Sequence, residues 1–207
     1  FFQVFQPRGG GKRQAPTFDV VAPGIAKHEE EIVLAPGADP KSDPCLALRA
    51  AVAAAEFGLP IAPGTLQNLK SCPIDDRTWN DESRSLFLRL LASGPALLQV
   101  WEEIDFVDIP GRLIPEWLAI RNRPSASAAH RYTIDRHSVE VVTRLGRETP
   151  RGNRYDDRHY QALLLAGILH DIGKIFDYKI DTETGIVDYD DNFRKEWLSH
   201  SQYGFSI

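Results

Sequence analysis

A His-Asp dipeptide and an upstream histidine are the residues of this chain whose types and spacing could do chemistry. His170 and Asp171 end an apolar run and are followed by Gly173 and Lys174, where a helix should end. His137 lies on an earlier stretch with helical periodicity. Ionisable side chains on a buried segment cost free energy unless something pairs with them. We therefore predict that His137, His170 and Asp171 hold one divalent metal ion between two packed helices.

The chemistry that such a site supports is hydrolysis of a phosphodiester. This reaction needs a nucleophilic water and neutralised phosphate oxygens, and a divalent metal supplies both. Imidazole and carboxylate ligands without thiolates favour Mn²⁺, Mg²⁺ or Fe²⁺ over structural zinc. The predicted catalytic groups are Asp171, which can orient or deprotonate the attacking water, and Lys174, which can contact a phosphate oxygen. His200 is either a further ligand, for a second metal or the substrate phosphate, or a surface histidine.

Each of these residues alone has an ordinary structural explanation. A single His137 on an apolar helix face is more often a hydrogen-bonded core histidine than a metal ligand, and an isolated His-Asp dipeptide is no more specific. The joint pattern is what favours metal ligands. His130 and His159 stand at predicted helix starts and are expected to be structural or solvated.

Two predicted helices carry the candidate ligands. The first spans 133–146, where His137, Val141 and Leu145 recur at helical spacing and share the stripe expected to face the core. The second begins at a cap on Asp156 or Asp157 and ends at a left-handed glycine, Gly173. Its shared face is expected to comprise Tyr160, Leu164, Gly167 or Ile168, and Asp171.

Adjacent residues lie about 100° apart around a helix. His170 and Asp171 can therefore reach one ion only near a helix end, which Gly173 is expected to create.

Composition divides the chain into three segments. Residues 1–41 are rich in Gly and Pro and predict an irregular segment of loops with room for one hairpin. Residues 42–124 predict a helical lead-in segment, and a small polar stretch marks the boundary to the site-bearing domain at 125–207. We predict an all-α fold. The lead-in helices are expected at 46–57, 64–72, 82–92, 96–106 and, as a short helix or turn, 109–117.

The overall composition is that of an ordinary soluble globular chain, with 43% hydrophobic and 26% charged residues among 207. The net charge of −5 argues against a nucleic-acid surface. No apolar run is long enough for a membrane span, and nothing resembles a signal peptide. Two cysteines are too few for a disulfide scaffold, so a cytoplasmic protein is expected. The chain contains no methionine, so we expect a piece of a longer protein.

The residues His170-Asp171-Ile172-Gly173-Lys174, preceded by His137, resemble the HD phosphohydrolase superfamily, whose fold is a helical bundle. A narrower resemblance comes from HRYTIDRH at 130–137 after RLIPEW at 112–117. This combination is similar to the central region, linker plus HD domain, of the PII uridylyltransferase/uridylyl-removing enzymes in their actinobacterial form. Shorter similarities to the family's linker and helical segment lie at 23–25, 31–34 and 58–63.

The resemblance implies that the HD domain removes a nucleotidyl group, UMP or AMP, from the PII nitrogen-regulatory protein by metal-dependent hydrolysis. The family's nucleotidyltransferase domain would lie upstream and its sensor domains downstream. The family's transfer reaction uses a Gly-Ser pair followed by an Asp-x-Asp pair that holds the metals, and this combination is not found here, so we do not expect this piece to perform the transfer. The family's metal site also closes with a later aspartate, and no convincing candidate precedes Ile207. We therefore expect the HD domain to be incomplete.

Two other functions stay open. Residues 175–199 separate Lys174 from His200, whereas the family reaches its corresponding His-Ser segment sooner. This longer spacing favours an HD phosphohydrolase that acts on free nucleotides or RNA. A missing closing aspartate would instead favour a non-catalytic module that senses or binds a partner. Metal analysis of the purified chain distinguishes an enzyme from such a module.

Overall fold

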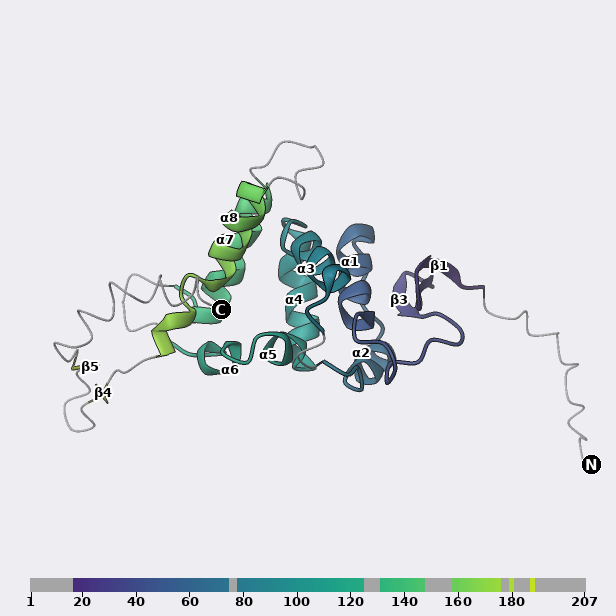
Figure 1. The fold of residues 1–207 in the computed structure, drawn as a ribbon, viewed down its shortest axis with the longest axis horizontal. Helices are drawn as coiled ribbons and strands as arrows, with labels where there is room; N and C mark the ends of the chain where they lie inside the picture. The colour runs from purple at the N-terminus through teal and green to yellow at the C-terminus, as the bar shows by residue number, and fades with distance from the viewer. Residues whose placement is uncertain are drawn as a thin grey trace, which may run out of the picture.

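The computed structural model describes residues 17–74, 78–124, 131–147, 158–175, 179–180 and 187–188. Within these residues the fold is mostly helical, as predicted (Figure 1). The helices are α1 (Leu46–Phe57), α2 (Pro63–Leu69), α3 (Asp81–Leu91), α4 (Ala96–Phe106), α5 (Ile109–Leu113), α6 (Trp117–Ile120), α7 (Ile134–Arg147) and α8 (Arg158–Leu169). A 3-10 helix, η2 (Ile172–Ile175), follows α8, and two short strands, β4 (Lys179–Ile180) and β5 (Val187–Asp188), pair with each other.

Helix α1 forms the centre of the lead-in segment and has the predicted bounds. Its alanines have high helix propensity, and most of its residues are buried. Gly58 ends it with a positive φ of 64° and donates its N–H to the carbonyl of Ala54. Glycine adopts this left-handed conformation without steric cost, which explains why the helix ends there.

Helices α3 and α4 also confirm the sequence prediction to within one residue at each end. The side chain of Asn80 caps α3 by accepting the backbone N–H of Ser83. The apolar positions predicted for α4 are all buried: Leu97, Val100, Trp101 and Ile104. The short segments differ more, because α2 begins at Pro63 and ends at Leu69, and the stretch 109–117 divides into α5 and α6.

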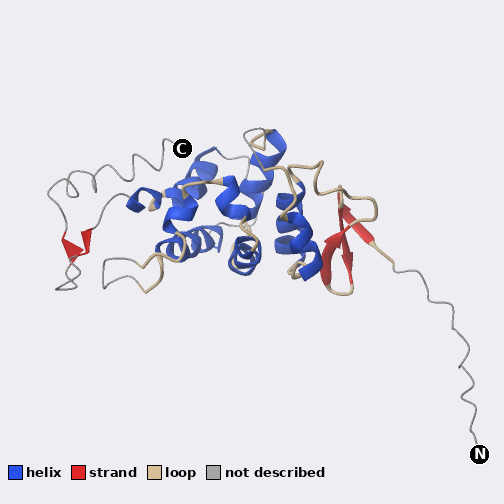
Figure 2. Cartoon of the chain, turned by 90° about the horizontal axis from the view of Figure 1, so that it is seen from below, coloured by secondary structure: helices blue, strands red, loops and turns tan. Residues whose placement is uncertain are grey.

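The prediction of a purely α-helical fold is wrong for residues 19–34, where the N-terminal segment, predicted as loops with room for one hairpin, has three strands. Strands β1 (Asp19–Ala22), β2 (Ile25–His28) and β3 (Glu31–Leu34) form an antiparallel sheet at one end of the helices (Figure 2). Ile25 and Ile32 are completely buried in the same core as α1. Backbone hydrogen bonds from Ile32 to Pro60 and from Ala62 to Ile32 join β3 to the connection between α1 and α2.

One hydrophobic core runs from the sheet to η2. Helices α7 and α8 lie side by side, and each also packs against the lead-in helices, α7 against α4 and α3, and α8 against α3 (Figure 1). The predicted boundary near residue 124 adjoins residues 125–130, which lie outside the described residues. None of the helices in the described ranges is both long and apolar enough to cross a bilayer.

Candidate metal centre

The close packing of α7 against α8 positions the candidate ligands. A Cβ atom built on Gly167 of α8 would lie 2.9 Å from Leu145 and 3.0 Å from Val142 of α7. Only a residue without a side chain therefore allows the helices to approach this closely at Gly167. The approach brings His137, in the first turns of α7, opposite the end of α8.

The predicted stripe of α7 is only half-buried at this contact. His137, Val141 and Leu145 are each partly exposed, and the buried positions of the helix lie elsewhere. These buried positions are Ile134, Asp135, Ser138, Val139, Val142 and Thr143. The stripe thus lies at the edge of the core, where a metal ligand can remain accessible.

The end of α8 differs from the prediction. The helix ends at Leu169, and Gly173 lies inside η2 instead of forming a left-handed end. The backbone N–H of His170 still bonds to the carbonyl of Ala166, and the chain then tightens into the 3-10 turn. His170 and Asp171 therefore occupy the junction between the two helices, which allows adjacent side chains to turn toward one point.

The predicted buried face of α8 is confirmed. Tyr160, Leu164 and Ile168 are at most 8% exposed, Asp171 is 3% exposed, and Gly167 is buried. The close approach at Gly167 was not predicted. A glycine in the interior of an apolar helix was the available signal for it.

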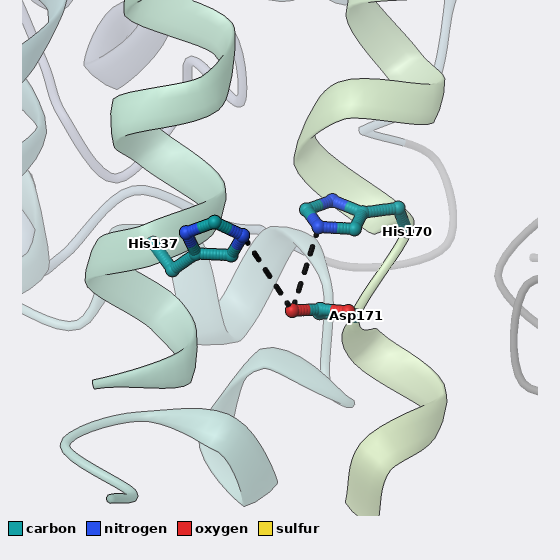
Figure 3. Close-up of side chains that lie close together, drawn as sticks. All are labelled: His137, His170 and Asp171. Carbon is teal, nitrogen blue, oxygen red and sulfur yellow. Dashed lines mark ion pairs between the residues drawn. The ribbon is translucent and has the colours of Figure 1, made fainter. Parts of the chain in front are cut away.

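The three predicted ligands converge (Figure 3). Asp171 Oδ2 lies 3.4 Å from His170 Nε2 and 4.0 Å from His137 Nε2. The two imidazole rings lie 5.3 Å apart between centroids, at an interplanar angle of 66°. One ligand atom from each residue lies within 4.8 Å of the other two. No other such group of three or more His, Cys, Asp or Glu side chains occurs among the residues that the structure describes.

A backbone hydrogen bond sets the orientation of one imidazole. His170 Nδ1 lies 2.9 Å from the carbonyl oxygen of Gly167, which can only accept, so Nδ1 carries the proton. The lone pair of Nε2 is then available on the side facing Asp171. The Asp171 side chain is 4% exposed, whereas those of His137 and His170 are 31% and 33% exposed. The carboxylate of this group is thus buried, and its two imidazoles are accessible from solvent.

These distances fit a shared divalent cation. Two ligand atoms, each about 2.1 Å from one ion, are about 3.0 to 4.2 Å apart for bond angles from 90° to 180°. The separations of Asp171 Oδ2 from the two Nε2 atoms, 3.4 and 4.0 Å, fall within that range, and all three ligand atoms lie within 4.8 Å of one another. Two nitrogens and a carboxylate without a thiolate suit Mn²⁺, Fe²⁺ or Mg²⁺.

The other candidate residues are placed in part. Lys174 belongs to η2, but its side chain is outside the described residues. His200, His130, Asp156 and Asp157 also lie outside them. His159 is exposed at the start of α8, as expected.

Comparison with known proteins finds several relatives that share one name. The chain is 40% identical over 168 residues to the bifunctional uridylyltransferase/uridylyl-removing enzyme of Streptomyces coelicolor, covering 81% of this chain and 19% of the relative. The enzyme of the same name from Mycobacterium tuberculosis is 40% identical over 152 residues, covering 73% and 18%. That of Corynebacterium glutamicum is 36% identical over 135 residues.

No family model and no solved structure matches the chain. The chain spans about a fifth of the length of these curated relatives. The chain therefore shares partial homology with the actinobacterial bifunctional uridylyltransferase/uridylyl-removing enzymes.

Proposed function

We propose that this chain carries an HD-type, metal-dependent phosphohydrolase site that removes a nucleotidyl group, UMP or AMP, from a PII signal protein. The observation that carries this proposal is the convergence of His137, His170 and Asp171 on one point. It is supported by partial homology to enzymes whose name includes a uridylyl-removing activity. The PII substrate is the one that the sequence resemblance implies.

In this proposal His137, His170 and Asp171 hold a divalent cation, Mn²⁺ or Mg²⁺ or Fe²⁺. When bound, such a cation neutralises phosphate oxygens and lowers the pKa of a coordinated water. The Asp171 carboxylate is also the base that orients the attacking water and receives its proton. Lys174 follows on η2 and would place a cation beside the phosphate of the substrate.

The exposure of the site agrees with a catalytic rather than a structural metal. Structural sites are closed by protein ligands, whereas catalytic sites keep positions open for water and substrate. Here the group contributes three protein ligands, and both imidazoles are about one third exposed. A phosphodiester attached to the surface of another protein could reach such a site directly.

The test uses the purified 207-residue chain and PII carrying either UMP or AMP. Free nucleoside monophosphate is measured by chromatography with Mn²⁺ or Mg²⁺ and with EDTA. We expect metal-dependent release that EDTA stops and that Asp171→Asn abolishes. His159→Ala alters an exposed histidine outside the metal group and should retain the activity.

Each alternative function gives a different outcome. Hydrolysis of free nucleotides or RNA without release from PII would indicate a different HD phosphohydrolase and refute the proposed substrate. Absence of metal binding, with no effect of His170→Ala on the melting temperature in Mn²⁺, would indicate a non-catalytic module.

A further inference from the structure

A second polar feature lies on the other side of α7. A cavity of about 210 Å³, open on one side, lies between α4, α6, α7 and the residues flanking them. Asp135, which lines it, is two residues from His137, about 200° around the helix. The cavity is therefore separate from the metal centre.

The cavity is lined by buried polar atoms that have no partner. Within the described part of the chain, Trp101 Nε1 and Asp135 Oδ1 are buried and make no hydrogen bond, and Trp117 Nε1 and Asp105 Oδ1 are buried with only a weak interaction between their two side chains. The residues Trp101, Trp117 and Asp135 are 4%, 1% and 8% exposed. Buried polar groups almost always have partners, because leaving one unpaired costs about 1–3 kcal/mol. One unpaired donor and one unpaired acceptor at this cavity, beside a weakly paired donor and acceptor, indicate a polar occupant.

The two carboxylates are held in place by their second oxygens. Asp105 Oδ2 accepts from Arg121 Nε at 2.9 Å, and Asp135 Oδ2 accepts from the backbone N–H of Asn122 at 2.9 Å. These bonds fix the orientation of both groups before any ligand enters. The two Oδ1 atoms remain available as acceptors for an occupant.

The charge around the cavity favours a cation. Glu102, Asp105 and Asp135 contribute three carboxylates to the lining, whereas Arg136 contributes one guanidinium. Arg136 already forms ion pairs with Glu102 and with Glu140. Burial raises the pKa of Asp105, and Arg121 and a hydrogen bond from Trp117 oppose this effect only in part.

The aromatic side chains add to this preference. The indole rings of Trp101 and Trp117 meet edge to face, with centroids 5.1 Å apart. Indole faces attract cations, and each ring also contributes one N–H donor. The donors require an oxygen acceptor on the same occupant.

We propose that this cavity binds a small primary amine that also carries an oxygen acceptor. Its ammonium group donates to Asp105 Oδ1 and Asp135 Oδ1, and its oxygen accepts from the indole N–H groups of Trp101 and Trp117. The volume, below the usual 300–1,000 Å³ of drug-sized pockets, limits the occupant to about ten non-hydrogen atoms. The excess of carboxylates favours a net cation over a zwitterion or a neutral alcohol.

Ethanolamine is the probe for this proposal, with ethylene glycol and glycine as neutral and zwitterionic controls of similar size. Binding to the full chain is measured by isothermal titration calorimetry and ligand-observed NMR. We expect saturable binding of ethanolamine and at least tenfold weaker binding of both controls, the equivalent of losing one charge-assisted hydrogen bond. Equal binding of all three compounds would show that the ammonium charge does not decide binding, and binding of none would mean that the cavity holds water only; either result would overturn the proposal.

Three variants locate the binding. Asp135→Asn keeps an oxygen that can accept from the backbone N–H of Asn122 but removes the negative charge. Trp101→Phe removes the indole N–H donor. Each variant should bind ethanolamine about tenfold or more weakly. Asp81→Asn makes the same charge change on the exposed face of α3, outside the cavity, and should leave binding unchanged. If Asp135→Asn fails to fold, Trp101→Phe decides: unaltered binding by a folded Trp101→Phe protein refutes the assignment. Mn²⁺ binding should be the same in all variants, because the metal centre is separate.

Discussion

The imidazole of His170 donates its Nδ1–H to the carbonyl oxygen of Gly167, one turn earlier on α8, at 2.9 Å. The same glycine allows α7 to approach, since its missing side chain leaves space for Leu145 and Val142. Gly167 thus determines both the orientation of one ligand and the distance of the helix that carries the other. The geometry of the candidate metal centre depends on this one position.

Gly167→Ala should therefore weaken metal binding more than it weakens the fold. The new Cβ would lie 2.9 Å from Leu145 and 3.0 Å from Val142, so α7 must shift and move His137 away from His170. Overpacking costs about 1–3 kcal/mol, and the higher helix propensity of alanine offsets about 1 kcal/mol of it. We expect at least tenfold weaker Mn²⁺ binding by calorimetry, with a small change in the free energy of unfolding.

Gly64→Ala is the matched control for this variant. Gly64 lies in α2, and an added Cβ there meets no atom within 4 Å. Metal binding should be unchanged. Equal metal affinity in Gly167→Ala and Gly64→Ala would refute the role of the close approach.

Much of the helical framework could be predicted, because local signals and tertiary packing agree there. The ends of α1 and α4 follow from Gly58 and from the Gly94-Pro95 pair, which interrupt the apolar periodicity. The sheet could not be predicted in the same way. Its strands have four residues each, too few for alternation to be distinct, and its second turn uses Glu29 and Glu30 at positive φ instead of glycine.

The ligand types of the site were predictable, but their geometry was only partly so. His137, His170 and Asp171 were identified by type and spacing, and the structure brings them together. The prediction placed the helix end at Gly173, whereas the chain leaves the α-helix after Leu169. The polar cavity had no sequence signal, because Asp105 and Asp135 come from separate helices and resemble ordinary helix-surface carboxylates.

His137→Ala should abolish stabilisation of the fold by metal. A ligand that binds only the folded state at 100 times its Kd raises the free energy of unfolding by about 2.7 kcal/mol. We expect Mn²⁺ to raise the melting temperature of the unaltered chain and of His159→Ala, but not of His137→Ala. The measurement is thermal unfolding by circular dichroism with Mn²⁺ and with EDTA. A Mn²⁺ effect that persists in His137→Ala would place the metal elsewhere.

Arg49 joins three parts of the N-terminal half, and its loss should destabilise the fold. Its guanidinium contacts Asp43 and Glu82, each at 2.6 Å, and the carbonyl of Pro23 at 3.0 Å. Burial lowers the pKa of Arg49, but the hydrogen bonds to Glu82 and Asp43 outweigh this effect, so that the pKa is raised above its ordinary value. Removing the mostly buried guanidinium leaves Asp43 and the half-exposed Glu82 uncompensated, so Arg49→Ala should cost about 2 kcal/mol.

Arg84→Ala provides the comparison for Arg49, because Arg84 pairs with Asp81 on the exposed face of α3. Exposed ion pairs contribute little, so this variant should unfold at nearly the same denaturant concentration as the unaltered chain. Similar urea midpoints for the Arg49 and Arg84 variants would contradict the bridging role of Arg49.

The buried thiol of Cys72 should make stability fall at alkaline pH. Burial raises the pKa of Cys72 from 9.0 to about 11. Between these values the unfolded chain loses the thiol proton and the folded chain keeps it, so ionisation favours unfolding as pH rises. This group should therefore remove about 2 kcal/mol of stability between pH 9 and pH 11. Cys72→Ala lacks the thiol, so its urea midpoint should fall less than that of the unaltered chain over the same pH range. The midpoint of this variant should start lower, because a buried side chain has been made smaller. Parallel pH profiles for the two proteins would show that other groups cause the alkaline loss.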